Sequence, residues 1–234
     1  MLESHFLKPV EIERPALQAP PGWTSLPELL LLRIRFPLPP EKLNEFYEAC
    51  SAPRRELAAA YRQPEDRVRC LAAGWLLEHA LPGSRLLEAR DEKGKPYLQG
   101  LPGTSISLTH SEAWVACAVH DQPVGVDIER PRAADAGLAG TFMSPLELEQ
   151  YAACPQADRL DYFSRLWTAK EAYLKAVGTG FSRPPGAVTL KIYGAELNTR
   201  PGGDGPWGFH GSVLEDGSRL ALCWRRGGEN RPGR

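Results

Sequence analysis

The chain has 234 residues, of which 42% are hydrophobic, and its formal net charge at pH 7 is -1. This length suffices for one large domain or two modest lobes. Because the charge is nearly balanced, no global electrostatic field would draw the protein onto nucleic acid or a membrane surface, and any site for an anion must be local. The five cysteines are scattered and none has C-x-x-C spacing, which argues against a disulfide framework or a zinc site and indicates a reducing compartment.

The first segment, residues 1–25, is rich in proline and predicts an arm that wraps the domain or stays mobile. It contains no long apolar run and therefore does not resemble a signal peptide. Residues 29–36 read LLLLRIRF; this run is too short to span a bilayer and is interrupted by two arginines, so we interpret it as a strand. We expect a cytoplasmic protein that binds neither membranes nor nucleic acid.

Hydrophobic spacing and turn signals divide the rest of the chain into two successive units. After the first strand we expect helices at 40–50, 52–61 and 64–81 and strands at 105–109 and 114–119. A strand at 124–129 then precedes helices near 145–153 and 158–176 and strands at 187–193, 207–214 and 219–225. This order predicts an α+β protein of two similar lobes, each a small antiparallel sheet packed with helices. The lobes would span 26–123 and 124–225, and residues 226–234 would form a disordered tail.

The most informative strand reads PVGVDIERP, residues 123–131. Since alternate residues of a strand share a face, Asp127 and Glu129 point away from the apolar face and lie about 7 Å apart. A solvated sheet face would give the same pattern. Two carboxylates at this spacing can also hold a hard divalent cation such as Mg²⁺, which keeps waters and takes further ligands from a phosphate substrate.

A third acid is offered by the predicted helix WTAKEAYLK, residues 167–175. Glu171 and Lys175 stand four residues apart, and as an exposed pair they would add only a few tenths of a kcal/mol to the helix. Glu171, however, lies at the edge of the apolar face, one turn beyond Trp167, and a half-buried glutamate is costly unless it is paired or bound to a metal. Lys175 would stand beside the same metal ion. Because both are positively charged, anionic atoms such as phosphate oxygens must lie between them. The combination suggests a pyrophosphate site.

Other candidate residues are less distinctive. Lys95 and Pro96 belong to a Gly-Lys-Pro turn, His110 follows a strand, and Arg54 and Arg69 are part of a loose basic group on the early helices. Each has a structural alternative, because turn lysines are usually solvated, a histidine at a strand end is more often structural, and helix surfaces carry arginines routinely. The chain lacks the P-loop, Rossmann, zinc-protease and serine-hydrolase motifs.

Taken together, these pieces resemble the 4'-phosphopantetheinyl transferase superfamily, Sfp type. The motifs that carry the resemblance are GVDIE at 125–129, WTAKEAYLK at 167–175, the Gly-Lys-Pro turn at 94–96 and LTHS at 108–111. They occur in the family's order, and the chain length suits its single-chain, pseudodimeric branch. Two departures are visible: Thr109 replaces the usual serine before the histidine, and Thr179 stands in the loop GTG where a charged residue is common.

The resemblance implies an active site at the interface of the two lobes. Asp127, Glu129 and Glu171 would hold Mg²⁺, for which Mn²⁺ could substitute. A carrier-protein serine, deprotonated by Glu171 or a metal-bound water, would attack the β-phosphate of coenzyme A, and Lys175 would neutralise or protonate the leaving 3',5'-ADP. Glu171 and Lys175 would therefore be catalytic. The implied coenzyme-binding residues are Arg54, Arg69, Lys95, Pro96, His110, Asp127, Lys170 and Lys175.

The implied partner is an apo acyl or peptidyl carrier protein of fatty-acid, polyketide or nonribosomal-peptide synthesis, and we expect a monomer. The carrier would dock on residues 141–151, where Phe142, Met143 and Leu146 are apolar; the alternative is that these side chains belong to the core. Two rival functions stay open. A metal-dependent phosphohydrolase would use water in place of the carrier serine, and a non-catalytic carrier-binding module would have solvated acids.

Overall fold

A computed structural model describes residues 11–17, 25–179, 183–193, 196–198 and 207–225. The first half contains β1 (Ile12–Glu13), β2 (Glu28–Arg33), α1 (Pro40–Glu48), α2 (Ala52–Ala60), α3 (Pro64–Ala80), β3 (Glu88–Arg90), β4 (Pro96–Leu98), β5 (Ser105–Ser111) and β6 (Trp114–His120). The second half contains β7 (Val124–Glu129), α4 (Ala136–Phe142), α5 (Pro145–Ala153), α6 (Arg159–Val177), β8 (Lys191–Tyr193), β9 (Glu196–Asn198), β10 (Trp207–Val213) and β11 (Arg219–Arg225). Short 3-10 helices occupy Ser84–Leu86 (η1), Gln156–Asp158 (η2) and Pro185–Ala187 (η4). The predicted mixed α+β class with small antiparallel sheets is confirmed.

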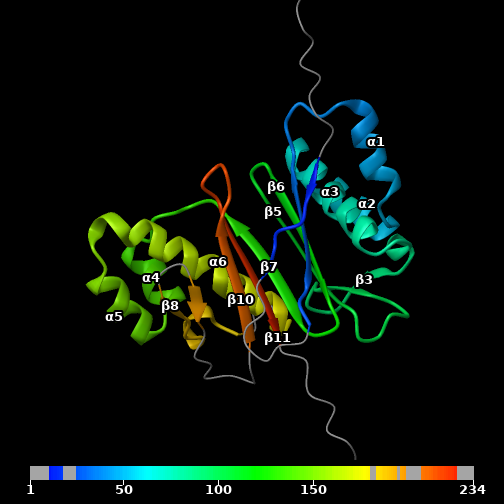
Figure 1. Ribbon diagram of the computed structural model, residues 1–234. Coiled ribbons are helices and arrows are strands. Elements are labelled where there is room, and N and C mark those ends of the chain that lie inside the picture. The colour runs from blue at the N-terminus through cyan, green and yellow to red at the C-terminus, as the bar shows by residue number, and fades with distance from the viewer. Residues whose placement is uncertain (1–10, 18–24, 180–182, 194–195, 199–206, 226–234) are drawn as a thin grey trace, which may run out of the picture.

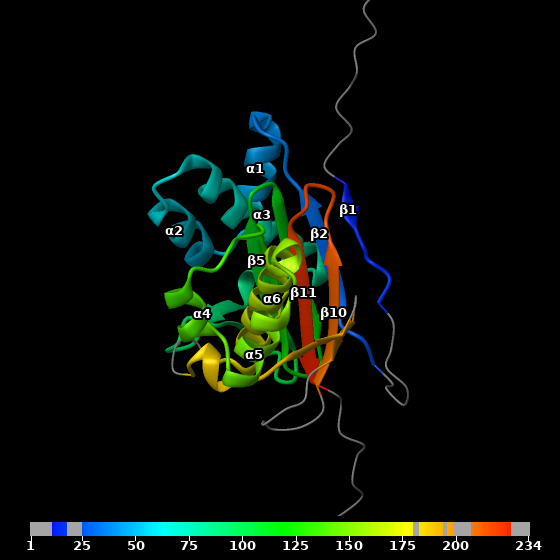
Figure 2. The ribbon, with the colours of Figure 1, turned by 90° about the vertical axis from the view of Figure 1, so that its left-hand side faces the viewer.

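Two antiparallel sheets form the centre of the molecule. The first sheet has the strand order β1-β2-β6-β5, and the second has the order β10-β11-β7. Figure 1 shows both sheets between two groups of helices, with α1, α2 and α3 on one side and α4, α5 and α6 on the other. Turned by 90°, α6 faces the viewer, with β11 and β10 visible beside it (Figure 2). The pairs β3-β4 and β8-β9 form separate two-stranded sheets.

The inner strands β2, β6, β7 and β11 are buried on both faces. In β2, Leu30 and Leu32 join a core with α3, whereas Leu29 and Leu31 face a second core between the sheets. In β11, Leu220, Leu222 and Trp224 complete this central core, and the alternate residues of the same strand pack against α6. The layers are therefore helix, sheet, sheet and helix. This double burial accounts for the unbroken leucine run of β2, since a strand covered on both faces does not need polar alternation.

The same order of elements occurs twice. A strand (β2) is followed by three helices, a short hairpin (β3-β4) and two strands, and the strand β7 is followed by the same series. The sheet positions also correspond, because β6 lies between β2 and β5 just as β11 lies between β7 and β10. The first sheet uses residues up to His120 and the second begins at Val124.

Side-chain hydroxyls join the facing edges of the two sheets. Ser105 Oγ of β5 accepts a hydrogen bond from the Val124 backbone N–H at 3.2 Å, and Ser107 Oγ accepts one from Val126 at 3.0 Å. We call these two contacts the hydroxyl seam. It brings β5 beside β7 without a backbone ladder, and it satisfies two buried donors that would otherwise be left unpaired.

The structure differs from the expected segments at one strand and covers only part of the expected N-terminal arm. The strand expected at 187–193 is wrong in its first part, because Ala187 ends η4 (Pro185–Ala187) and only residues 191–193 pair with another strand, β9. Of the expected N-terminal arm, residues 11–17 are described, and Ile12 and Glu13 pair with β2. The expected tail, 226–234, lies outside the described residues. No helix in the described part of the chain is long and apolar enough to cross a membrane.

Candidate active site

Helix α6 packs directly against the polar face of β7. A Cβ atom on Gly125 would lie 2.0 Å from the backbone oxygen of Ala172 and 2.4 Å from the nitrogen of Ala176. Only glycine permits this approach, because real side chains cannot come so close to backbone atoms. The face that carries Asp127 is therefore covered by the helix, and Asp127 itself is only 3% exposed. The alternative of a solvated sheet face is excluded for Asp127.

Asp127, Lys175 and Thr109 form one buried polar cluster. Lys175 Nζ lies 2.6 Å from Asp127 Oδ1 and donates to Thr109 Oγ1 at 3.1 Å, while the Thr109 hydroxyl donates to Asp127 Oδ1 at 3.2 Å. The second carboxylate oxygen, Oδ2, is buried and has no hydrogen-bond partner among the described residues. One oxygen of Asp127 is thus fixed by protein contacts, and the other is left for a ligand.

Glu129, at the end of β7, is held by an aromatic residue of α6. Trp167 Nε1 donates to Glu129 Oε1 at 3.1 Å, and Arg132 Nη2 lies 3.6 Å from Glu129 Oε2. The Trp167 ring is itself fixed between the Phe142 ring, stacked at 4.0 Å between centroids, and the Arg132 guanidinium at 4.5 Å. These contacts orient the Glu129 carboxylate.

Glu171 differs from the other two acids because it makes no hydrogen bond or ion pair with any residue that the structure describes. Burial and the negative charge of Asp127 raise its pKa above that of an ordinary glutamate, and the same two causes raise the pKa of Glu129. Glu129 also raises the pKa of Glu171, whereas Lys175 lowers it. Acids that repel one another in a buried position are typical of functional sites that bind a cation.

These observations bear on the expected metal site. Within the described ranges, no three histidine, cysteine, aspartate or glutamate side chains are arranged to hold a metal ion. Instead, the ammonium group of Lys175 neutralises Asp127. The donor chemistry nevertheless fits a hard divalent cation, since it consists of carboxylate oxygens, among them Oδ2 of Asp127 and the Glu171 carboxylate, which have no hydrogen-bond partner among the described residues.

Glu171, together with Lys175 and Trp167, lines a pocket of about 470 Å³, a volume typical of small-molecule sites. Asp127 and Glu129 are not among its lining residues, but they contact Lys175 and Trp167, respectively. Its walls come from both halves of the chain: the turn before β4, strand β5, the end of α4, helix α6 and the segment after it. Lys95 and Pro96 line it as expected, and Lys95 Nζ donates to the backbone oxygen of Ala176 at 3.0 Å. Burial lowers the pKa of Lys95. Gly178, at φ +73°, ends α6 here and leaves room for the lysine stem.

His110 and Arg69 lie near each other in the first half of the chain, and neither is among the residues that line the pocket. Burial lowers the pKa of His110 from 6.5 to about 4, so that its ring is neutral at pH 7. The ring stands edge-on to Tyr61, with centroids 5.9 Å apart. Arg69 pairs with Asp66 at 2.7 Å and also donates to the backbone oxygen of Glu112.

Two basic residues expected to bind the coenzyme are instead built into the interior. Arg54 is 3% exposed and donates from Nε and Nη2 to the carboxylate of Glu88. Lys170 is fully buried; its amine donates to Glu147 and to the backbone oxygens of Phe142 and Pro185, the latter two at 2.9 Å. Neither side chain lines the pocket. The structure thus contradicts a direct ligand contact for both, because a buried charge must remain with its partner.

Of the three residues expected to dock the carrier, two are buried and one is exposed. Phe142 and Met143 are buried in the core that α6 forms with the second sheet, as the core alternative expects. Leu146, in the first turn of α5, is 39% exposed. Only Leu146 of these three presents its side chain at the surface.

Sequence reasoning missed several residues of the site. Arg90, Lys93 and Arg183 line the pocket, but each is a single cation in a loop or strand end and has no motif to signal it. Trp167 was treated only as part of an apolar face, although its position in the motif WTAKEAYLK could have indicated a role near the acids. Thr109 was noted only as a neighbour of His110.

Comparison with known proteins gives a family for this chain. The sequence model of the 4'-phosphopantetheinyl transferase superfamily matches residues 123–219. A 4'-phosphopantetheinyl transferase of Bacillus subtilis is 31% identical over 195 residues, which cover 80% of this chain and 87% of the relative. The chain belongs to the 4'-phosphopantetheinyl transferase superfamily.

Further relatives of the transferase agree. The 4'-phosphopantetheinyl transferase Sfp of Bacillus subtilis strain 168 is 28% identical, covering 80% of this chain and 87% of its own, and HetI of a Nostoc species is 32% identical, covering 71% and 76%. Among solved structures, the holo-[acyl-carrier-protein] synthase of Thermotoga maritima covers 45% of this chain and 64% of its own, with 20% identity and a TM-score of 0.37. The resemblance to the Sfp type and the predicted enzyme class are confirmed: this protein is a phosphopantetheinyl transferase.

Proposed function

We propose that the enzyme transfers the phosphopantetheine arm of coenzyme A to a serine of an acyl or peptidyl carrier protein, with Mg²⁺ and with release of 3',5'-ADP. The observation that supports this most is one pocket lined by the Glu171 carboxylate and by lysines from both halves of the chain, with Asp127 of β7 bonded to one of these lysines, Lys175. Acids alone would suit a cation and lysines alone an anion. Both together suit a metal-bound pyrophosphate.

Asp127, Glu129 and Glu171 would hold Mg²⁺ or Mn²⁺. Such an ion, when bound, acts as a Lewis acid and orients phosphate oxygens. Thr109 fixes the orientation of Asp127, and Trp167 with Arg132 fixes that of Glu129. These contacts reduce the reorganisation needed when charge develops on the substrate.

The transfer step would use Glu171 as the proton acceptor and Lys175 beside the leaving group. The serine Oγ forms a bond to the β-phosphorus, the bond from that phosphorus to the oxygen of 3',5'-ADP breaks, and the serine proton passes to Glu171. A carboxylate with a raised pKa is a better proton acceptor than an ordinary one. Lys175 would stabilise the leaving phosphate, since a third of its side chain is exposed toward the pocket. Lys95 would contact the phosphates from the opposite wall, and His110 with Arg69 would contact the 3'-phosphate.

The repeated order of elements supports a pseudodimeric interpretation, with lobes 26–123 and 124–225 and the site between them. Lys95 and Thr109 come from the first half, and Asp127, Glu171 and Lys175 from the second. We expect a monomer in the cytoplasm, and the five free cysteines suit a reducing compartment. The carrier would dock near Leu146, and the exposed Arg130 could steer an acidic partner toward the enzyme.

The test is incubation of the enzyme with coenzyme A, Mg²⁺ and apo carrier proteins of several classes, followed by intact-mass analysis of the carriers. A mass increase of one phosphopantetheine on an apo carrier, abolished when its acceptor serine is replaced by alanine, is expected. Consumption of coenzyme A without any carrier would instead indicate a phosphohydrolase. Carrier binding without Mg²⁺-dependent coenzyme binding would indicate a non-catalytic module.

A further inference from the structure

The pocket concentrates positive charge on a chain that is nearly neutral overall. Of the described residues that line it, five are basic and one, Glu171, is acidic; the basic residues are Arg90, Lys93, Lys95, Lys175 and Arg183. Lys175 is neutralised by Asp127 and Lys95 is bonded to a helix carbonyl. Only Lys175 has an acid partner among the described residues, so Lys95, Lys93 and the two arginines all add positive charge that a ligand can use.

Arg183 lines the pocket from the segment that follows α6. It lies between Gly178, where the helix ends, and η4, and it is half-buried. Its Nη1 is 3.4 Å from the Tyr173 hydroxyl, and its guanidinium lies 5.8 Å from the Tyr173 ring. No carboxylate of a described residue forms an ion pair with it. A guanidinium held by an aromatic residue and lacking an acid partner is suited to a phosphate, because its planar donors can bind two oxygens at once.

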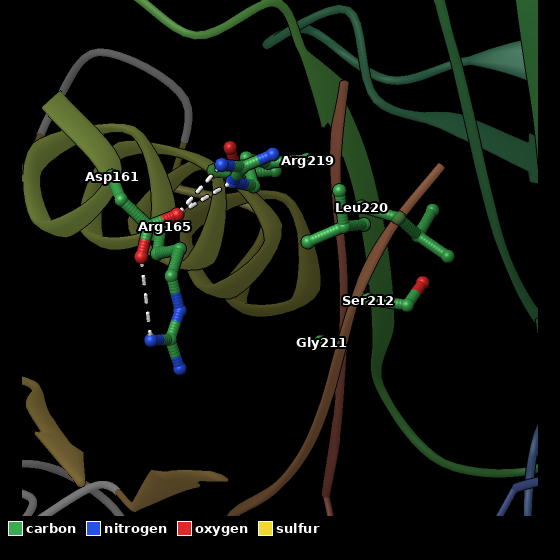
Figure 3. A pocket seen from close by; sticks show the side chains of 8 residues that line it. Asp161, Arg165, Gly211, Ser212, Arg219 and Leu220 are labelled. Carbon is green, nitrogen blue, oxygen red and sulfur yellow. Dashed lines mark hydrogen bonds and ion pairs between the residues drawn. The ribbon is translucent and has the colours of Figure 1, made fainter. Parts of the chain in front are cut away.

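The arginines of a second pocket make an instructive contrast. Figure 3 shows Arg165 and Arg219 converging on Asp161, between α6 and the β10-β11 hairpin. Arg219 Nη2 lies 2.7 Å and Arg165 Nη1 lies 3.7 Å from the Asp161 carboxylate. The same residue type lines both pockets, but only in the second is its charge balanced by an acid.

We propose that Arg183 binds a phosphate group of the coenzyme A substrate, as a specificity residue that no motif of the chain marks. The inference rests on the proposed function. Two groups of the coenzyme could supply the oxygens, the pyrophosphate and the 3'-phosphate. Because Arg183 lines a pocket rather than the outer surface, a small-molecule phosphate is favoured over an acidic side chain of the carrier.

The test is a binding titration of the full chain with coenzyme A and with 3'-dephospho-coenzyme A in the presence of Mg²⁺, comparing wild type with Arg183→Gln and Arg183→Lys. Loss of a charge-assisted contact should weaken coenzyme A binding by about tenfold or more in Arg183→Gln. Arg183→Lys should retain part of the affinity, since lysine keeps the charge but not the planar donors. An equal loss for both ligands assigns Arg183 to the pyrophosphate; a loss for coenzyme A alone assigns it to the 3'-phosphate.

Arg165→Gln is the matched control, because it removes the same charge from the second pocket and should leave both affinities unchanged. The inference is overturned if Arg183→Gln binds both ligands as tightly as wild type. It is also overturned if only the carrier KM rises, which would assign Arg183 to the carrier. If the wild type neither binds coenzyme A nor modifies any carrier, it is the proposed function that fails.

Discussion

The three carboxylates of the candidate site have unequal partners. Asp127 is neutralised by Lys175 and Glu129 is held by Trp167, but Glu171 has no partner among the described residues. Partial burial and the negative charge of Asp127 disfavour the ionised form of Glu171, so its pKa is raised. Glu171 is thus the residue where removal of charge should cost function without costing stability.

Replacement of Glu171 by glutamine should lower turnover by orders of magnitude while the melting temperature stays equal or rises. The amide keeps the shape of the side chain but cannot accept the serine proton and binds Mg²⁺ more weakly. Turnover with a modified carrier, measured over a range of Mg²⁺ concentrations, checks this, and raised Mg²⁺ should restore part of the rate. Glu56→Gln, on the exposed face of α2 and away from the site and the expected docking segment, is the control. Near-wild-type transfer by Glu171→Gln at low Mg²⁺ would contradict the mechanism.

His110 should make the fold sensitive to acid. Its pKa is about 4 in the folded state against 6.5 for an ordinary histidine, so between these values the unfolded chain binds a proton that the folded chain does not. Stability is therefore lost as the pH falls from about 6.5 toward 4. Burial is the main cause of the lowered pKa. The positive charges of Arg69 and Lys175 lower the pKa further, whereas the negative charge of Asp66 raises it. Urea unfolding at pH 7.5 and pH 5 should show a smaller acid loss for His110→Gln than for wild type; equal losses would show that His110 is not responsible.

At the scale of elements, the contact between β7 and α6 is the one that places the acids. Gly125→Ala would push a methyl group into the backbone of the helix at Ala172 and Ala176. We expect a loss of about 3 kcal/mol in the free energy of unfolding, together with loss of activity. Gly140→Ala is the matched control, since a Cβ there meets nothing within 4 Å, and alanine in an exposed helix should stabilise by about 0.5–1 kcal/mol. Denaturant unfolding of both variants measures the difference; similar effects would contradict direct packing.

Lys170 ties α6 to α5 and η4. Its removal leaves the Glu147 charge buried, so Lys170→Met should lower the free energy of unfolding by about 3–5 kcal/mol. The double variant Lys170→Met/Glu147→Gln, which restores neutrality, should recover part of that loss in a double-mutant cycle. A Lys170→Met variant that melts like wild type but binds coenzyme A poorly would contradict this and support the direct contact expected from the sequence.

Sequence patterns located the elements that carry the acids but not the partners of individual charges. Strand 124–129 and the helix ending at Gly178 were predictable, because alternation and a glycine stop are local signals. Arg54 and Lys170 were misinterpreted because their acids, Glu88 and Glu147, lie 34 and 23 residues away, a separation that no local pattern reports. Arg183 was missed because it is a single cation in a loop that no motif marks.

At the scale of the whole molecule, the layer arrangement could not be predicted. The sequence indicated two units, and each does form a sheet with its own helices. It gave no sign that the sheets share a third core, since residues such as Leu29 and Trp224 are equally compatible with either face of a strand. The hydroxyl seam could not be predicted from the sequence either, because serines in a strand normally indicate an exposed edge.

The chain passes from the first sheet to the second only through residues 121–123, between β6 and β7. A cut there would yield two fragments, each with a helix-covered sheet and each exposing half of the central core, Trp114 in one and Trp224 in the other. Such fragments should aggregate when expressed alone and reassemble when expressed together, since the apolar faces fit only each other. Because pocket residues come from both fragments, activity would return only on reassembly. The fold is thus suited to a split reporter, in which carrier modification records that two fused partners have met.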